Sequence, residues 1–297
     1  MSDKILELSD KLKSKIYLDY NVGKHTWFRT GGNAKIFIII ENNFELEIIL
    51  NELNNENFYV LGSGSNLLIR DTGFNGVIIK LGKEFNSVNI IENKLEVGAS
   101  VLDINLSKFA LKHGIEGFEY FSGIPGSVGG AVKMNAGCYG SETKEILNSV
   151  EFYNKKLQKQ NKNKENLNLT YRSSNIKDNE IISKVTFNLK YGDSNIIQHK
   201  MIDIKEKRLS TQPIKNKTSG STFKNPTNLF AARLIEEAGC KGMEYGNAVV
   251  SNQHANFLIN KGRATATDIE NLGKQVVDKV YKKFNIILEW EIKIIGD

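Results

Sequence analysis

The sequence predicts a protein of mixed α and β structure with two domains. Its 297 residues exceed the size at which a single hydrophobic core usually stops growing. Strand-like and helix-like patterns alternate in the first part of the chain, and a long helical pattern begins near residue 195. We therefore expect one domain over residues 1–194 and a second over residues 195–297.

The predicted first domain begins with a strand and a helix. Residues 34–40 are typical of a buried strand, and Asn42 or Asn43 would cap the helix that follows. Short strands are expected at 58–61 and 76–80. The apolar face of the helix is expected to contain Phe44, Ile48, Ile49 and Leu53.

Farther along, strand-like alternation at 150–153 and 185–189 brackets a stretch rich in Lys and Asn at 154–168. That stretch is expected to be a solvated hairpin or loop. Helices are then predicted from about 195 to 209 and from about 229 to 239.

Two pairs of residues have the spacing of a helix capping box. Ser100 with Asp103 predicts the start of a helix that ends at Gly114. Thr267 with Glu270 predicts the start of a helix near the C-terminus. A final strand follows, because apolar and polar residues alternate there. Its apolar face would contain Leu288, Trp290 and Ile292, and its polar face Glu289, Glu291 and Lys293.

Composition excludes several classes of protein. The longest purely aliphatic and aromatic run, Ile36 to Ile40, is too short to span a bilayer, and the N-terminus lacks a signal layout, so we expect a cytoplasmic protein without membrane insertion. Cys138 and Cys240 are too few for a disulfide framework and are expected to be packing residues. The four His residues have no metal-ligand spacing, so no metal is expected.

The net charge of +6 raises the question of nucleic acid binding. Much of the excess lies in the 154–168 stretch, where no aromatic residue is interleaved for base stacking. We therefore expect no nucleic acid partner, and no obligate protein partner is evident. Only six of the 40 Lys and Arg residues are Arg, which suggests that Arg stands where its planar fork matters.

Two glycine-rich loops predict a backbone cradle for a dinucleotide, because glycine lets N–H groups approach a phosphate closely. The first follows a predicted strand and fits neither the Rossmann fingerprint nor a Walker sequence. The second holds four glycines in eight residues and is followed by amide groups that suit a heteroaromatic edge. The loop residues expected to bind the cofactor are Leu61, Gly62, Ser63, Gly64, Ser65 and Asn66 in the first, and Gly123, Ile124, Pro125, Gly126, Ser127, Gly129 and Gly130, with Asn135, Ala136 and Gly137, in the second.

These segments, in order along nearly the whole chain, resemble the UDP-N-acetylenolpyruvoylglucosamine reductase (UDP-N-acetylmuramate dehydrogenase) family. The matching blocks are 25–32, 61–68, 123–137, Tyr171-Arg172, 220–226, 251–257 and 288–291. No room is evident between Arg172 and Ser221 for the tyrosine-bearing loop of the longer subtype, so the chain resembles the shorter one. Ser63 and Ser127 stand where Gly and Thr are common in the family.

The resemblance implies an α+β fold: a two-part FAD-binding domain of the vanillyl-alcohol-oxidase (PCMH) type, with parts near 1–80 and 81–194, and a C-terminal substrate-binding domain. It implies FAD as cofactor, NADPH as hydride donor and UDP-N-acetylenolpyruvoylglucosamine as substrate.

The resemblance also implies roles for single residues. Ser221 would be the proton donor, and Arg172 and Glu291 would polarise the substrate carboxylate and stabilise the intermediate. Lys224, Asn225, Arg208 and Gln253 would contact the substrate. Glu289 shares the polar face with Glu291, and only the family motif favours Glu291.

Two other interpretations stay open at this point. The same fold could serve an FAD-dependent alcohol or sugar oxidase that passes electrons to oxygen. A module that binds nucleotide or nucleic acid without catalysis is the other. Without the resemblance, Ser221 would be interpreted as a turn residue and Arg172 as a surface cation.

Overall fold

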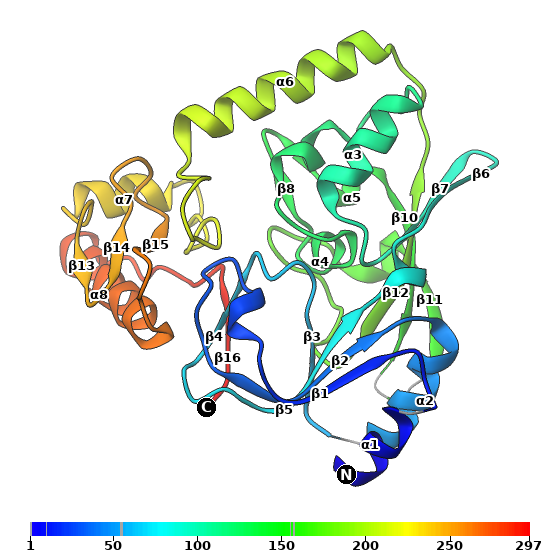
Figure 1. The fold of residues 1–297 in the computed structure, drawn as a ribbon. Coiled ribbons are helices and arrows are strands. Elements are labelled where there is room, and N and C mark those ends of the chain that lie inside the picture. The colour runs from blue at the N-terminus through cyan, green and yellow to red at the C-terminus, as the bar shows by residue number, and fades with distance from the viewer. Residues whose placement is uncertain (1, 10, 54–55, 155, 157) are drawn as a thin grey trace. The chain divides into compact units, whose positions relative to one another are not determined.

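The computed structural model describes residues 2–9, 11–53, 56–154, 156 and 158–297, drawn in Figure 1. The chain forms two compact units, neither continuous in sequence. The first contains Met1–Leu18, Ile36–Ser63 and Gly76–Glu206, and the second contains Asp19–Lys35, Gly64–Asn75 and Lys207–Asp297. Contacts therefore group two N-terminal segments with the C-terminal residues, unlike a single boundary at residue 194.

The first sheet has the strand order β1-β2-β5-β3, and β3 pairs in parallel with β5. The predicted strands at 34–40, 58–61 and 76–80 are three of its members. Long runs of Ile, Val and Phe make β2 and β5 almost wholly buried, as strands covered on both faces are. The strands are β1 (Lys15–Asn21), β2 (Asn33–Ile40), β3 (Phe58–Val60) and β5 (Phe74–Leu81).

The second sheet, of order β11-β10-β12-β7-β6, is antiparallel and belongs to the first unit. The Lys- and Asn-rich stretch forms β11 and a 3₁₀ turn, so it is a hairpin with β10, as predicted. The strands are β6 (Val88–Ile91), β7 (Lys94–Gly98), β10 (Leu147–Tyr153), β11 (Lys159–Asn163) and β12 (Ile181–Asn188).

Helices and one small hairpin complete the first unit. Helix α4 packs on β12 and β7 (Figure 1), and the hairpin of β8 and β9 lies in the loop region that follows α4. One continuous core contains Ile36, Leu95, Phe121 and Phe187. The elements are α1 (Ser2–Ser9), α2 (Asn43–Leu53), α3 (Asp103–Lys112), α4 (Val128–Lys133), β8 (Gly137–Cys138), β9 (Ser141–Glu142), α5 (Thr143–Ile146) and α6 (Ser194–Thr211), whose last turn belongs to the second unit.

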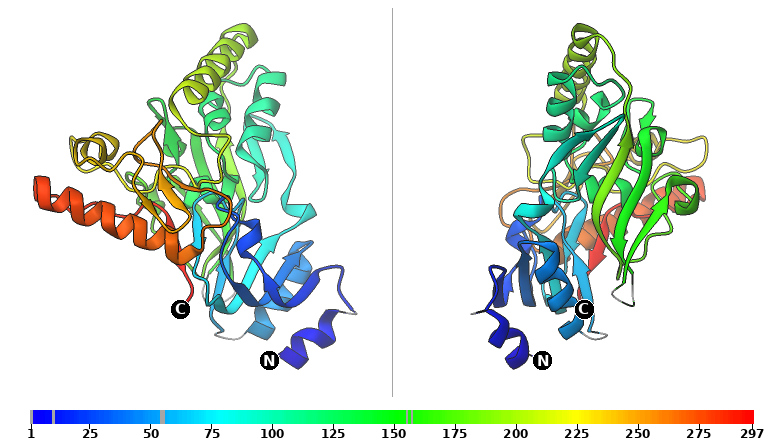
Figure 2. Two further views of the ribbon diagram at one scale, coloured as in Figure 1. Left: turned by 60° about the vertical axis from the view of Figure 1, so that its left-hand side comes forward. Right: turned by 90° about the vertical axis from the view of Figure 1, so that its right-hand side faces the viewer.

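The second unit is built around helix α8, which packs on β14 and β15 of a three-stranded sheet (Figure 2). Its separate core includes Phe28, Leu68, Val276 and Leu288. Strand β16 pairs in parallel with β4, and β4 directly follows the first glycine-rich loop in the chain. The elements are β4 (Leu67–Ile69), α7 (Ala231–Glu237), β13 (Glu244–Tyr245), β14 (Ala248–Val250), β15 (Leu258–Asn260), α8 (Ala266–Phe284) and β16 (Lys293–Ile295).

The predicted start of α2 is correct, but its predicted buried face is partly wrong. Asn42 caps α2 by accepting from the Glu45 N–H, as expected, but Phe44 is 72% exposed, and the buried face uses Leu46 and Leu50 instead. Ile49 and Leu53 of the expected set are buried, Ile48 is half-buried, and Glu45 is buried although it was not expected on that face.

Both predicted capping boxes are wrong. Ser100 donates its hydroxyl to the Gly82 carbonyl, while Asp103 is buried inside the first turn of α3. Helix α8 begins two residues earlier than expected, because Thr265 and Asp268 form the box. Asp71 also binds the first turn of α8, because its side chain accepts hydrogen bonds from the Ala266 and Thr267 N–H groups.

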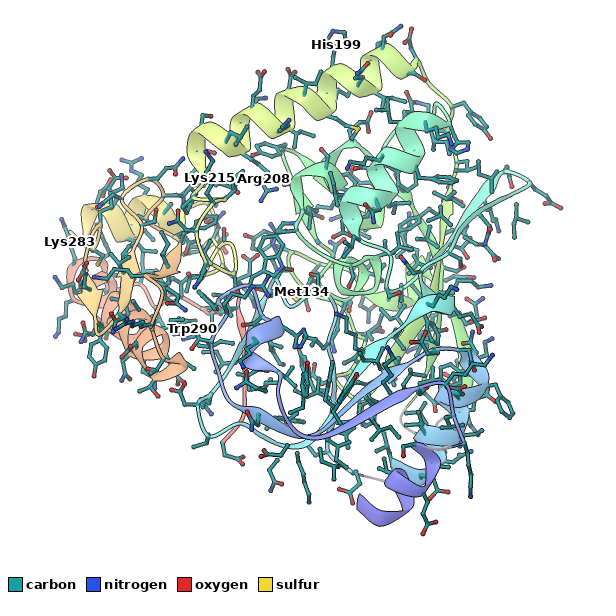
Figure 3. All side chains as sticks on the ribbon, viewed as in Figure 1. Met134, His199, Arg208, Lys215, Lys283 and Trp290 are labelled. Carbon is teal, nitrogen blue, oxygen red and sulfur yellow. The ribbon has the colours of Figure 1, made fainter. Side chains whose placement is uncertain are left out.

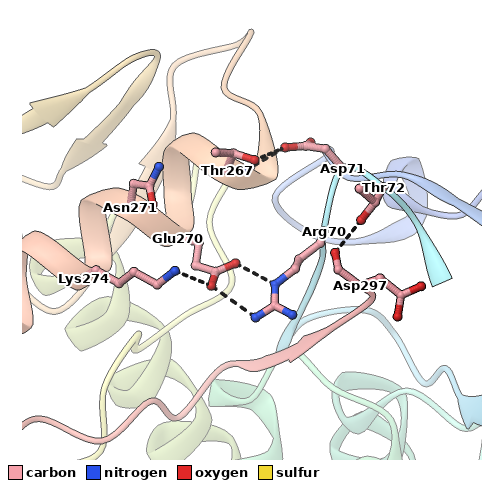
Figure 4. A pocket seen from close by; sticks show the side chains of 8 residues that line it. All are labelled: Arg70, Asp71, Thr72, Thr267, Glu270, Asn271, Lys274 and Asp297. Carbon is pink, nitrogen blue, oxygen red and sulfur yellow. Dashed lines mark hydrogen bonds and ion pairs between the residues drawn. The ribbon is translucent and has the colours of Figure 1, made fainter.

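A polar pocket in the second unit is centred on the side chain of Arg70 (Figure 4). Its Nε lies 2.9 Å from Glu270 Oε2 and its Nη2 lies 3.2 Å from Oε1, a two-pronged ion pair across 200 residues of sequence. Lys274 adds a second cation at 2.8 Å from Glu270. The hydrogen bond from Arg70, followed by the Lys274 contacts, holds the pKa of Glu270 below its ordinary value despite burial.

No helix in the described part of the chain combines the length and apolar composition needed to cross a membrane.

Glu270→Gln should lower the free energy of unfolding by about 1 kcal/mol at neutral pH, since Glu270 is buried but its partner Arg70 is half-exposed and screened by water. A lowered folded-state pKa contributes stability above the unfolded pKa, roughly 4.3, and that stability is lost as pH falls through the folded pKa. The difference from the unsubstituted protein in urea unfolding should therefore shrink on acidification. Glu237→Gln, which breaks the exposed Arg233 pair, is the control and should change little. A loss for Glu270→Gln that is independent of pH would contradict this account.

Candidate active site

The second glycine-rich loop is backed by residues 99–103. The N–H of Gly129 donates to the Ala99 carbonyl at 2.9 Å, that of Val128 to Val101 at 2.9 Å, and that of Asp103 to Gly126 at 3.1 Å. One side of the loop is thus hydrogen-bonded to residues 99–103 as the edge of a β-strand is to its neighbour. Because its backbone is fixed before a ligand arrives, little ordering entropy remains to be lost on binding.

Gly126 faces a buried acid. A Cβ at Gly126 would lie 2.3 Å from Asp103 Oδ2, so only glycine fits there without a shift. Asp103 is fully buried, neither of its carboxyl oxygens has a hydrogen-bond partner among the residues that the structure describes, and burial raises its pKa well above the ordinary value. Burial therefore favours the neutral form of this acid. The neutral form suits a position beneath a loop that is expected to hold an anionic diphosphate.

The first glycine-rich loop runs from one unit into the other. Leu61, Gly62 and Ser63 belong to the first unit, and residues 64–66 belong to the second. In the first unit a Cβ at Gly62 would lie 2.5 Å from Ser127 Oγ, so the two glycine-rich loops touch there.

In the second unit, Gly64 has a positive φ of 72° and its carbonyl accepts from the Trp27 N–H. Asn66 donates its side-chain amide to the Glu291 carbonyl at 2.9 Å. This part of the first loop is therefore held by hydrogen bonds, and a Cβ at Gly64 would lie 2.4 Å from the His25 carbonyl oxygen, which explains that glycine.

These features fit a dinucleotide such as FAD. The loops have glycines that allow a close approach to the backbone and small hydroxyl side chains, and burial favours the neutral form of the acid beneath the second loop. Cys138 fills space beside the second loop, where a Cβ at Gly123 would meet its Sγ at 2.9 Å. In the described part of the chain, neither Cys138 nor Cys240 forms a disulfide. Among the described residues, no His, Cys, Asp and Glu side chains are grouped as metal ligands would be.

Arg172 lies at the third position of a tight turn in the first unit. Thr170 and Ser173 exchange backbone hydrogen bonds of 3.1 and 3.2 Å, which close the turn. Arg172 has a φ of 54°, in the left-handed region that favours glycine. Its Nη2 donates to the Gly137 carbonyl at 3.0 Å, and its guanidinium lies 4.9 Å from the centre of the Tyr171 ring. Arg172 is therefore a held side chain beside the second loop and not a free surface cation.

The segments that contain Ser221 and Glu291 pair in the second unit. The Glu291 N–H donates to the Thr222 carbonyl at 2.9 Å, and the Lys224 N–H donates to Glu289 at 2.8 Å. The Phe223 and Trp290 rings pack with centroids 4.9 Å apart. The chain segment that carries Ser221 thus runs antiparallel to the one that carries Glu291. Both side chains are half-buried, whereas Glu289 is exposed.

Four further residues were expected to contact substrate, and all lie in the second unit. Lys224 pairs with Glu289 at 3.3 Å, and Asn225 accepts from the Ala231 N–H at the start of α7. Arg208, at the end of α6 in Figure 3, donates to Gln212, and Gln253 donates to the carbonyls of the same helix end. Arg208 and Gln253 are thus near each other. Their substrate contacts stay predictions.

The sequence patterns did not point to Glu142 or Lys144. Glu142 Oε2 accepts from Asn135 Nδ2 at 3.1 Å and from Lys144 Nζ at 2.7 Å. Burial alone would raise the pKa of Glu142, but these contacts and the charge of Arg172 hold it below its ordinary value. Only the β8–β9 hairpin brings these residues to the second loop, and the hairpin has no sequence signature beyond Gly140.

Comparison with known proteins agrees with this geometry. A profile of the UDP-N-acetylenolpyruvoylglucosamine reductase C-terminal domain matches residues 212–295, and one of an FAD binding domain matches residues 34–156. UDP-N-acetylenolpyruvoylglucosamine reductase of Rickettsia rickettsii (strain Sheila Smith) is 44% identical over 290 residues, covering 96% of this chain and 97% of that protein. The chain belongs to the UDP-N-acetylenolpyruvoylglucosamine reductase family.

Other relatives support the same family. The reductase of Orientia tsutsugamushi (strain Ikeda) is 42% identical over 292 residues, covering 96% of each protein. The crystal structure of the reductase from Thermus caldophilus superposes with a TM-score of 0.83 at 33% identity, covering 96% of this chain and all of that one. The chain is therefore an FAD-containing oxidoreductase.

The predicted fold class is confirmed. The 6-hydroxy-D-nicotine oxidase of Arthrobacter nicotinovorans superposes with a TM-score of 0.54 at 11% identity, covering 93% of this chain and 87% of that one. This likeness shows the fold alone. Together with the family matches, it shows an FAD-binding domain of the vanillyl-alcohol-oxidase (PCMH) type followed by the family's C-terminal domain.

Gly126→Ala should destabilise the FAD-free protein by roughly 1–3 kcal/mol, because the new methyl group overlaps Asp103 Oδ2. Thermal and urea unfolding measure this, and the flavin absorbance of the purified protein measures retained FAD, which should fall as well.

The double variant Asp103→Ala with Gly126→Ala tests the cause, because Asp103 is the group that the methyl would meet. It should recover much of the lost stability. Gly130→Ala, whose Cβ would meet Ser127 Oγ at an ordinary 3.5 Å, should leave the stability of the FAD-free protein nearly unchanged. Equal losses for both single variants would contradict the packing argument.

Proposed function

We propose that the protein reduces UDP-N-acetylenolpyruvoylglucosamine to UDP-N-acetylmuramate, with NADPH as hydride donor and FAD as cofactor, in peptidoglycan precursor synthesis. The observation that carries the proposal is the antiparallel pairing of the Ser221 and Glu291 segments inside a chain of this reductase family. An oxidase of alcohols would not need a proton donor beside an acidic residue in this arrangement.

The reaction adds a hydride and a proton across the double bond of an enol ether conjugated to a carboxylate. The hydride adds to one carbon, and the electron pair of the double bond moves toward the carboxylate as an enolate. The second carbon then takes a proton, which completes the lactyl ether. The protein must therefore stabilise negative charge at the carboxylate and supply one proton.

Ser221 is our candidate proton donor. A serine hydroxyl is a weak acid, so it can donate only to a strongly basic developing carbanion. The chain around it is fixed, because the Thr222 N–H donates to Asn256 and the Thr222 carbonyl accepts from Glu291. A donor on a fixed backbone needs little reorganisation at the moment of transfer. The proton lost from Ser221 must return from solvent between turnovers.

Arg172 and Glu291 are our candidates for managing charge. The guanidinium of Arg172 would bind the substrate carboxylate and stabilise the enolate, since its planar fork matches a carboxylate in two contacts. Glu291 would polarise the substrate from the side of Ser221. The left-handed backbone of Arg172 supports such a role, because strain of this kind gathers at functional sites.

The two glycine-rich loops would hold FAD, which when bound supplies the hydride that it receives from NADPH. Lys224, Asn225, Arg208 and Gln253 would contact the UDP-sugar. Lys224 and Arg208 are cations, and a diphosphate is the part of the substrate that cations would attract. Their current partners, Glu289 and Gln212, would then be exchanged for the ligand.

The proposal predicts two optical changes in the purified, FAD-loaded protein under anaerobic conditions. NADPH should bleach the flavin absorbance, and the enolpyruvyl UDP-sugar should then restore it. If the UDP-sugar leaves the reduced flavin bleached while air restores it rapidly, the substrate assignment fails and the oxidase interpretation gains.

Ser221→Ala should separate the two half-reactions. Reduction by NADPH should stay near the original rate, while reoxidation by the UDP-sugar should slow by about 10²–10⁴-fold, the usual contribution of a positioned acid. Stopped-flow absorbance measures both rates. Ser219→Ala is the matched control, because that buried hydroxyl has no hydrogen-bond partner in the described part of the chain. Equal slowing of both half-reactions in Ser221→Ala would contradict its role as proton donor.

A further inference from the structure

The turn that carries Arg172 is tied to the segment 133–137 at three points in the first unit. Ser174 Oγ donates to the Lys133 carbonyl at 2.7 Å, Asn135 Nδ2 donates to the Thr170 carbonyl at 3.0 Å, and Arg172 Nη2 donates to Gly137 at 3.0 Å. The first two bonds flank Arg172 in sequence, and the third is made by its own side chain. The position of Arg172 therefore depends on the segment 133–137.

Asn135 is the centre of these ties. Its side chain is fully buried, and its amide nitrogen donates both to Thr170 and to Glu142 Oε2. Its Oδ1 accepts from the Lys144 N–H at 2.9 Å. Both donors and the carbonyl oxygen are thus used inside the protein. A buried amide whose donors are already bonded is poorly placed to hold a ligand with its side chain.

The Arg172 turn needs such support. A non-glycine residue in the left-handed region costs of order 1–3 kcal/mol and persists only where neighbouring structure holds it. The Thr170 carbonyl accepts the bond that closes the turn, from Ser173, as well as the bond from Asn135. The Asn135 amide therefore acts on the carbonyl that defines the turn.

Charges around the same amide point the same way. Burial raises the pKa of Glu142, but Lys144 and the Asn135 hydrogen bond hold it below its ordinary value, and the positive charge of Arg172 adds a smaller contribution in the same direction. A carboxylate held near the guanidinium restrains Arg172 without using the donors that the substrate carboxylate requires, since its hydrogen bonds go to Asn135 and Lys144. Backbone and charge are thus both set through Asn135.

We infer that Asn135 is a positioning residue for the reductive step: its amide fixes the turn and the counterion of Arg172, and so orients the guanidinium toward the substrate carboxylate. The inference rests on the proposed function, because it assumes the role of Arg172 given above. It differs from the sequence expectation that Asn135 binds the cofactor, and the two have different consequences.

The test is a double-mutant cycle on the reoxidation of reduced flavin by the enolpyruvyl UDP-sugar. Asn135→Ala should slow this step roughly 10–100-fold, the cost of a misplaced reacting group or a lost supporting contact. Flavin reduction by NADPH and the FAD content per protein should change little. In an Arg172→Ala background, Asn135→Ala should cause almost no further loss, because residues that act as a unit are not additive.

Thr143→Val is the matched control. Thr143 is equally buried and donates its hydroxyl to Ala136 in the same segment, but it does not contact the Arg172 turn. It should leave reoxidation close to the original rate. Asn135→Ser, which keeps a short polar group, is the second variant if the alanine variant folds poorly, and it should give the same non-additive pattern.

The outcomes are distinct. Loss of FAD, or slower reduction by NADPH, in the Asn135 variants would overturn the inference in favour of cofactor binding. An equal fold loss in both the original and Arg172→Ala backgrounds would overturn it in favour of a general structural role. Failure of the UDP-sugar to reoxidise the flavin of the unsubstituted protein would instead refute the proposed function itself.

Discussion

The close pairing of residues 99–103 with the second glycine-rich loop is the constraint on which the first unit's functional features depend. It fixes Gly126, Val128 and Gly129 at backbone distance from their partners and leaves no room for a side chain above Asp103. Helix α4 starts directly from this pairing, and the segment 133–137 continues from the end of α4. That segment in turn holds Arg172. One short run of backbone hydrogen bonds therefore positions the cofactor loop and a catalytic candidate together.

The two units contribute different chemistry to the proposed reaction. The first contributes the second loop and a guanidinium whose charge can stabilise an enolate, and burial raises the pKa of Asp103 beneath the loop. The second contributes a hydroxyl and a carboxylate on paired segments. The first loop continues from one unit into the other. In this account neither unit alone has the complete set of groups that the reaction requires.

Local patterns were sufficient to predict some of the individual elements. The buried run of β2 and the Asn42 cap depend on neighbours in sequence, and both are confirmed. The final strand was predicted too early: Trp290 forms only an isolated bridge with Phe223, and β16 begins at Lys293. The family resemblance added the fold class and the cofactor. Both capping boxes failed for a physical reason: the Ser100 hydroxyl donates to Gly82 and the Thr267 hydroxyl to Asp71, while Thr265 and Asp268 form the box that starts α8.

Reversal of the chain direction also explains what was missed in the candidate site. Glu142 and Lys144 reach Asn135 only because the short hairpin of β8 and β9 reverses the chain, and no rule of sequence spacing predicts that hairpin. The scarcity of Arg was a useful guide at Arg70 and Arg172, whose guanidinium groups make directed contacts. It failed at Arg233, which forms an exposed pair with Glu237 on one helix.

The most direct test of the central claim is the stoichiometry and product of an anaerobic reaction between the FAD-loaded protein, NADPH and UDP-N-acetylenolpyruvoylglucosamine. The account predicts that each NADPH oxidised yields one molecule of UDP-sugar that has gained two hydrogens, as mass spectrometry would show, with UDP-N-acetylmuramate as the product. An unchanged UDP-sugar, with NADPH oxidised only when oxygen is admitted, would contradict it.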